Sequence, residues 1–234
     1  MIMPKKIAHV EHHVQQGGYI REVIYGFNDG IVSNFALIAG MAGAAVQNTI
    51  VVLVGLAGLV AGSISMGLGA YISTKSENEY YKNETEVEKW EIENMPEKEK
   101  EELIDIMERW GFKGKDLNDI VKHFFKNKKA QLKVMLSEEI GVPPEEKPAW
   151  VVGLTTFGVF VIGAILPVIP FLFVENVPSA LKLSAIFSLL CIFTVGGMKT
   201  LITGKSWWKS GAEMVIIAIL AAVVTYYVGG MFGV

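Results

Sequence analysis

The chain has 234 residues, of which 51% are hydrophobic and 19% charged, and its mean hydropathy is +0.39. Residues 73–149 hold 14 of the 21 Lys and Arg and 19 of the 24 Asp and Glu. A soluble protein spreads its charge over its surface, so this segregation favours membrane helices on both sides of a charged insert. The single cysteine, Cys191, excludes a disulfide framework within one chain. The mixed charges of the insert provide no basic patch for nucleic acid.

Five stretches are apolar and long enough to cross a bilayer, which takes about 20 predominantly apolar residues of helix. They are residues 25–46, 50–72, 150–174, 180–202 and 212–232. A soluble bundle of five buried helices is a poor alternative, because each helix would be apolar on all sides. We therefore predict an all-α integral membrane protein. Two transmembrane helices lie in residues 25–72, a helical insert in 73–149, and three more transmembrane helices in 150–234.

Basic residues near the ends of the spans predict the orientation. Two lysines and Arg21 lie in the polar N-terminal segment 1–24, and Lys205 and Lys209 lie between the fourth and fifth spans. The short links after the first and third spans carry none. We therefore expect the N-terminal segment and the insert in the cytosol. No cleavable signal peptide is predicted, since a polar stretch follows the lysines, and this short N-terminus favours a prokaryotic cell membrane.

The charged insert is predicted to be helical. The expected helices cover residues 76–94, 96–110, 116–127 and 129–140. Pro96 suits the first turn of the second helix and Gly111 its end. Asp116 is a suitable cap for the third helix, and Gly141 ends the fourth.

Acidic side chains lie on one face of each of the first two insert helices. The first row is Glu84, Glu88 and Glu91, and the second is Glu99 and Glu102. Spacings of three and four residues keep each row on one face, and the break before the second helix lets the two fold back as a hairpin. Clustered carboxylates repel unless cations bind between them. The pattern predicts a divalent metal site; the alternative is a solvated helix face interspersed with lysines.

Met135 and Glu139 lie one turn apart on the last insert helix. A thioether beside carboxylates moves the preference of a site from Mg²⁺ or Ca²⁺ toward later transition metals. The histidines form no close pair with a cysteine, which argues against a structural zinc site. The chain has no nucleotide-binding loop, GxSxG or HExxH. We therefore expect neither an enzyme, nor ATP-driven pumping, nor a permanently bound cofactor.

Asp29 places a carboxylate in or near the hydrocarbon, at a cost of about 2.5–3.5 kcal/mol on insertion scales. Such a group normally faces other helices or a water-filled path, although at the membrane edge it would cap the helix. Met66 by itself favours packing over a ligand role. Pro167 and Pro170 are expected to kink or end the third span.

Several stretches of this chain resemble the vacuolar iron transporter family, whose members are proton-coupled Fe²⁺/Mn²⁺ exporters that remove metal from the cytosol. They are GFNDGIVSNFALIAGMAGA, AGSISMGLGAYISTKSENEYY, MPEKEKEELIDIMERWGF, KAQLKVMLSEEIGV, GAILPVIPFLF and GGMKTLITGKSWWKSGAEM. The resemblance covers nearly the whole chain. It implies five membrane helices per subunit, a cytosolic helical metal-binding domain between the second and third, and a homodimer with its pathway between the subunits.

The resemblance also implies roles for individual residues. The pathway Asp and Met match Asp29 and Met66, and the acidic residue flanking the first span matches Glu22. The cytosolic metal-binding side chains match Glu88, Glu91, Glu99, Glu102, Met135 and Glu139.

The chain departs from the family pattern at three places. Leu136 stands where members can carry a second methionine. Gly58 replaces a glutamate that some members carry, and Gly69-Ala70-Tyr71 replaces the common GEY. Asp29 is therefore the remaining candidate on the first two spans for proton coupling.

We expect a proton-coupled exporter of Fe²⁺, with Mn²⁺ as a second substrate, that works as a homodimer in a lipid bilayer. Two alternatives remain open. The first is the same transporter with Mn²⁺ or Co²⁺ as the preferred ion. The second is a membrane-anchored metal buffer or sensor, which would bind Fe²⁺, Zn²⁺ or Co²⁺ in the insert without transport.

Overall fold

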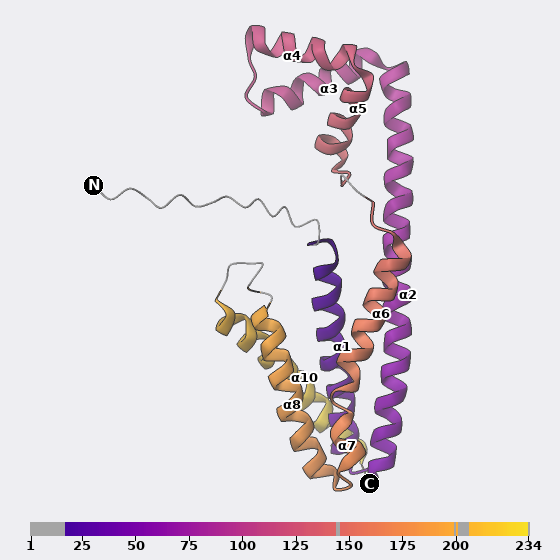
Figure 1. The fold of residues 1–234 in the computed structure, drawn as a ribbon, viewed down its shortest axis with the longest axis vertical. Helices are drawn as coiled ribbons and strands as arrows, with labels where there is room; N and C mark the ends of the chain where they lie inside the picture. Colours follow the sequence, from indigo (N-terminus) through magenta and orange to yellow (C-terminus); the bar gives the residue numbers. More distant parts are fainter. Residues whose placement is uncertain (1–16, 144–145, 199, 201–205, 234) are drawn as a thin grey trace, which may run out of the picture. The chain divides into compact units, whose positions relative to one another are not determined.

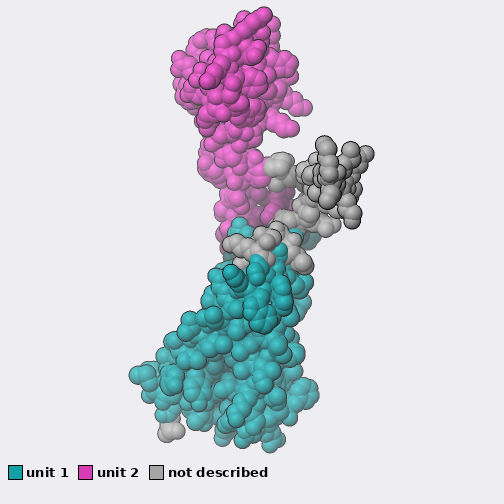
Figure 2. All heavy atoms as spheres, turned by 90° about the vertical axis from the view of Figure 1, so that its left-hand side faces the viewer, with its two compact units in different colours: residues 1–71, 150–234 teal, residues 72–149 magenta. Residues whose placement is uncertain are grey.

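The structure is a computed structural model that describes residues 17–143, 146–198, 200 and 206–233 (Figure 1). Every regular element within these ranges is a helix, which confirms the all-α prediction. The chain divides into two compact units, which Figure 2 colours separately. The first consists of residues 1–71 and 150–234, and the second of residues 72–149.

The first unit is a bundle of mostly apolar helices. It contains α1 (Gly17–Gly43), the first half of α2 (Asn48–Asn94), α6 (Ala149–Ile165), α7 (Ile169–Phe173), α8 (Val177–Met198) and α10 (Trp207–Phe232). By length and composition, α2, α8 and α10 could cross a membrane, whereas α6 is apolar but shorter. The five-span count stays a prediction. The predicted end of the fourth span, at 202, lies outside the described residues.

Helix α1 begins at Gly17, eight residues before the apolar stretch predicted from hydropathy. Arg21 and Glu22 interrupt the apolar residues before this stretch, so hydropathy does not report this part of α1, although both are compatible with a helix. Although α1 carries polar side chains, part of it lies in the interior of the bundle: Ile31, Ile38 and Asn34 are at most 2% exposed. The carboxamide of Asn34 donates hydrogen bonds to the carbonyl oxygens of Gly55 on α2 (3.1 Å) and Ala164 on α6 (2.6 Å).

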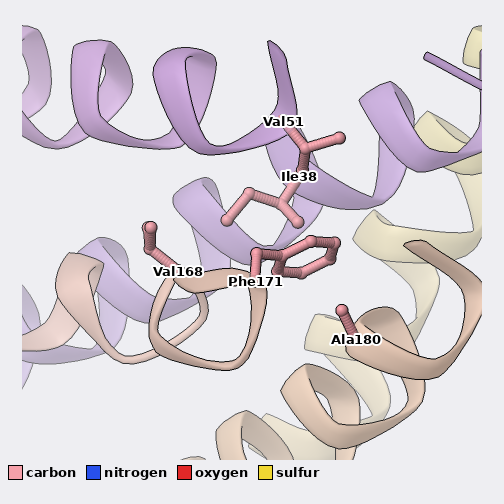
Figure 3. Close-up of a cluster of buried hydrophobic side chains, with 5 residues drawn as sticks. All are labelled: Ile38, Val51, Val168, Phe171 and Ala180. Carbon is pink, nitrogen blue, oxygen red and sulfur yellow. The ribbon is translucent and has the colours of Figure 1, made fainter. Parts of the chain in front are cut away.

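A cluster of buried side chains joins four helices of this bundle. Figure 3 shows the cluster, with Ile38 of α1, Val51 of α2, Phe171 of α7, Ala180 of α8 and Val168 from the turn before α7. This contact requires the chain to turn between α6 and α7, which it does at residues 166–168.

The prolines of the third span break it as predicted. Pro167 lies in the turn between α6 and α7, and Pro170 lies in the first turn of α7. The hydroxyl of Ser184 donates to the carbonyl oxygen of Pro167 at 2.8 Å. A carbonyl outside a regular helix thereby gains a partner in an apolar setting, where an unpaired backbone group is costly.

The outer faces of α2, α8 and α10 are apolar. In their most apolar windows, only 28%, 22% and 11% of the residues, respectively, are buried within the chain. Large side chains such as Leu53, Leu190 and Tyr227 are at least 60% exposed. Helices that are apolar all round need lipid or another copy of the chain around them, so the protein is an integral membrane protein.

The crossing of α1 and α10 predicts one stability result. A side chain at Gly229 would collide with the carbonyl oxygen of Gly40, and backbone cannot move away as a flexible side chain would. We expect Gly229→Val to lower the free energy of unfolding by about 1–3 kcal/mol, seen as a lower Tm in detergent. Gly158→Val is the matched control, because a Cβ at Gly158 meets no atom within 4 Å. If Tm falls equally in both variants, close backbone packing at Gly229 is not the cause of the loss.

The second unit holds the charged residues. It consists of the second half of α2, α3 (Pro96–Arg109), α4 (Gly114–Lys126), α5 (Lys128–Met135) and a short π-helix, η1 (Leu136–Ile140). Its core is the cluster of Leu103, Ile106, Met107, Val121 and Met135.

Two boundaries in this unit differ from prediction. The expected insert helix 76–94 is not separate, because α2 is one helix of 47 residues. The change from apolar to charged residues near Ile72 alters the surroundings of the helix but not its backbone hydrogen bonds. Helix α4 begins at Gly114 with Lys113 as its cap, so Asp116 is not the cap but lies in the first turn. A carboxylate there still stabilises the helix through the macrodipole. Gly111 and Gly141 have positive φ, as the predicted helix ends require.

Candidate metal centre

Three carboxylates converge where α2 ends and α3 begins. Only Met95 separates the two helices, and Pro96 starts α3 without leaving an N–H unsatisfied. This tight corner places Glu99, in the first turn of α3, against Glu88 and Glu91 in the last turns of α2. One oxygen from each of the three carboxylates lies within 4.8 Å of the other two. The corner thus brings the two predicted acidic rows together.

Two of these carboxylates are buried. Glu99 is 0% and Glu88 3% exposed. In the described part of the chain, one oxygen of Glu88 and both oxygens of Glu99 are buried without a hydrogen-bond partner, as is one oxygen of Glu102. Unpaired buried charge is strongly destabilising. A solvated helix face therefore does not describe Glu88 and Glu99, whereas a divalent cation would supply the missing partner.

The crowding of carboxylates changes their affinity for protons. Burial, together with the negative charge of Glu99, raises the pKa of Glu88 to about 8. Burial also raises the pKa of Glu99 above its ordinary value. On the outer side, the ammonium of Lys98 lies 3.6 Å from Glu91 and 3.2 Å from Glu102. Lys98 partly neutralises the exposed edge of the cluster, and its charge also acts on Glu99.

These pKa shifts predict a pH dependence of stability. A carboxyl group with a higher pKa in the folded state binds protons more tightly when folded, so folding becomes less favourable as pH rises above its ordinary pKa of 4.5. With a chelator present, we expect the stability of residues 72–149 to fall between about pH 5 and pH 8. Chemical unfolding of the full chain at a series of pH values measures this. Glu88→Gln should flatten the profile, and an equally steep profile in that variant would refute the assignment.

Met135 and Glu139 have different surroundings. Met135 is fully buried and packs in the apolar cluster with Leu103, Ile106 and Met107 of α3. Glu139 lies in η1, where burial and the charge of Glu102 raise the pKa of its carboxyl. The structure therefore brings Glu139 to the acidic residues and places Met135 in the adjoining core.

Glu102 and Glu139 also line an open cleft of about 580 Å³, together with Asp105, Ile106, Glu108 and Arg109. Glu84, one turn before Glu88, is partly exposed and does not belong to the group of three converging carboxylates. The candidate site is thus a set of three carboxylates, of which Glu88 and Glu99 are buried, with Glu102 and Glu139 beside it. Such a set of hard oxygen donors suits a divalent cation.

The other sequence candidates lie in the helical bundle. Glu22 and Asp29 are seven residues apart on α1, so they share a face, and both are partly exposed. Met66 is partly exposed on α2. Next to these residues the backbone packs closely on α6: a Cβ at Gly30 or Gly67 would clash with Phe160 or Phe157. Asp29 and Met66 thus stay partly exposed beside positions at which α1 and α2 pack closely on α6.

Two buried polar residues were missed by the sequence analysis. Asn34 links three helices, and Gln131 is 2% exposed in the second unit with no partner for its Nε2 among the described residues. A polar residue within an apolar span was the available signal for Asn34. The available signal for Gln131 was its spacing, since Gln131, Met135 and Glu139 follow one another at intervals of four residues in the predicted helix 129–140.

Comparison with known proteins gives a consistent result. The model of the VIT family matches residues 20–230. Vacuolar iron transporter 1 of Oryza sativa subsp. japonica is 34% identical over 219 residues, which cover 93% of this chain and 87% of the relative. Vacuolar iron transporter 1 of Arabidopsis thaliana is 32% identical, with 96% and 92% covered. The vacuolar iron transporter of Toxoplasma gondii is 33% identical, with 95% and 78% covered.

Proposed function

We propose that this chain, which belongs to the VIT family, moves Fe²⁺ out of the cytosol across a membrane in exchange for protons. The resemblance in the sequence is confirmed by the family match and by relatives named vacuolar iron transporters. Those relatives belong to eukaryotes and are named vacuolar, so they do not support the prokaryotic cell membrane that we expected.

The observation that carries this proposal is the converging group of Glu88, Glu91 and Glu99, in which Glu88 and Glu99 are buried. Clustered carboxylates, of which Glu88 and Glu99 are buried, gain most from a cation that replaces their lost water. The group lies in a charged unit joined by α2 to a bundle of membrane helices. Capture of the ion in the charged unit therefore precedes its passage through the membrane.

Passage through the membrane is assigned to Asp29, Met66 and Glu22. A divalent ion must lose water there, and ligands at membrane depth offset that cost. One chain offers few such groups, and two copies in a homodimer double them. Met66 adds a thioether, which favours Fe²⁺ over Mg²⁺ and Ca²⁺. Asp29 is the group proposed to exchange protons.

The test is flux in proteoliposomes across a panel of Fe²⁺, Mn²⁺, Co²⁺ and Mg²⁺, with and without a pH gradient. We expect Fe²⁺ to move fastest, Mg²⁺ not to move, and an opposing proton gradient to accelerate uptake. Protein-free liposomes are the control for leakage. Binding of Fe²⁺ without flux would instead favour a metal buffer or sensor, and faster Mn²⁺ or Co²⁺ flux would change the preferred ion.

A further inference from the structure

Gln131 is a polar side chain in the interior of residues 72–149, with 2% of its surface exposed. Among the buried, unpartnered side-chain atoms described in this unit, its Nε2 is the one donor, and the others are carboxylate oxygens of Glu88, Glu99 and Glu102. A buried donor without an acceptor costs about 1–3 kcal/mol. The unit thus contains an unpaired donor and unpaired acceptors that complement it.

The path of the chain places Gln131 at the level of the acidic corner. The segment after α5 runs antiparallel to α2: Asn78 donates to the carbonyl oxygen of Lys147 at 2.9 Å, and the charge of Glu139 acts on Glu88. Gln131 precedes Glu139 by eight residues, about two turns of α5 and η1. Eight residues beyond Glu88 along the chain lies Pro96, where α3 begins.

The helical register turns Gln131 toward α3. Gln131 and Met135 are four residues apart on α5, so they share a face, and both are buried. Met135 belongs to the same buried cluster as Leu103, Ile106 and Met107 of α3 and Val121 of α4. The buried face of α5 therefore faces a core to which α3, the helix that carries Glu99 in its first turn, contributes.

We propose that Gln131 is a positioning residue of the metal site, whose amide N–H donates to the oxygen of a cluster carboxylate that faces away from the bound ion. The inference rests on the proposed capture of divalent cations by Glu88, Glu91 and Glu99. A carboxylate that coordinates through one oxygen leaves the other free to accept a hydrogen bond. Such outer contacts fix the orientation of the ligand, and their loss typically weakens metal binding about 10–100-fold.

The experiment is calorimetric titration of the full chain in detergent with Co²⁺, for the parent and for Gln131→Met. Methionine has a similar length and lacks the donor. We expect Co²⁺ affinity to fall about tenfold or more, while Tm in the presence of chelator stays equal or rises because an unpaired buried donor is gone. A purely structural role predicts the reverse, a lower Tm with unchanged affinity. Lys133→Met, at an exposed position of α5, is the matched control and should change neither.

The outcomes separate this inference from the proposed function. The capture site and this inference both fail if the parent binds no Co²⁺. They also both fail if joint replacement of Glu88, Glu91, Glu99 and Glu102 by glutamine leaves Co²⁺ binding intact. If that quadruple change abolishes binding and Gln131→Met binds like the parent, the inference alone fails. If Gln131→Met does not fold, the Co²⁺ affinity of Gln131→Glu tests the inference instead, because this variant adds a charge at the same place. A change in Co²⁺ affinity of about tenfold or more supports the placement, and an unchanged affinity refutes it.

Discussion

Asp29→Asn is expected to lower the initial rate of Fe²⁺ flux by about 100-fold or more. The substitution keeps the shape of the side chain and removes its charge. In a homodimer, two copies of Asp29 would set two negative charges against the two positive charges of the ion. Removal of one partner from a buried charge pair costs about 3–5 kcal/mol, and each 1.4 kcal/mol added to a barrier slows the rate about tenfold.

The measurement is initial flux against Fe²⁺ concentration in proteoliposomes containing equal amounts of protein. Glu175→Gln is the matched control, because it removes an exposed carboxylate between α7 and α8 and should leave flux unchanged. Elution as a single species in detergent verifies that Asp29→Asn folds. Flux at the parental rate in Asp29→Asn would show that the proposed pathway is wrong.

The second large effect is expected from glutamine at Glu88, Glu91, Glu99 and Glu102 together. This variant should raise the Fe²⁺ concentration needed for half-maximal flux by about tenfold or more, equivalent to about 1.4 kcal/mol of lost binding. Its maximal rate should change little. A unit that holds most of the chain's charged side chains belongs in water. There it concentrates ions but cannot lower the barrier inside the membrane.

The control for this variant removes the same charge elsewhere in the same unit. Glu79, Glu86, Glu97 and Glu101 are exposed, and their joint replacement by glutamine should leave the half-maximal concentration unchanged. Equal shifts in both variants would mean that the net charge of the unit matters and the buried cluster does not. An unchanged value in the first variant would refute capture by the cluster.

Long apolar runs and their interruption by charge made the all-α membrane class predictable. Both features can be read from the order of residues in the sequence, without knowledge of any tertiary contact. The proline-induced break of the third span and the helix ends at Gly111 and Gly141 were predictable for a similar reason. Proline lacks an N–H and glycine tolerates positive φ, whatever surrounds them. Hydropathy did not report that α1 begins before the first apolar stretch, because a helix can continue through charged residues such as Arg21 and Glu22.

The acidic face of each insert helix followed from helical periodicity in the sequence, as did the possibility that a hairpin joins the two rows. Burial did not follow, because it depends on what packs over a residue. Only the tertiary structure distinguishes Glu88 and Glu99, which lose their water at the corner of α2 and α3, from Glu84, which stays partly exposed one turn away. It likewise decided that Met135 packs in the core and that Asn34 and Gln131 lie buried. Spacing alone determines which side chains share a face, and packing determines which of those faces loses contact with water.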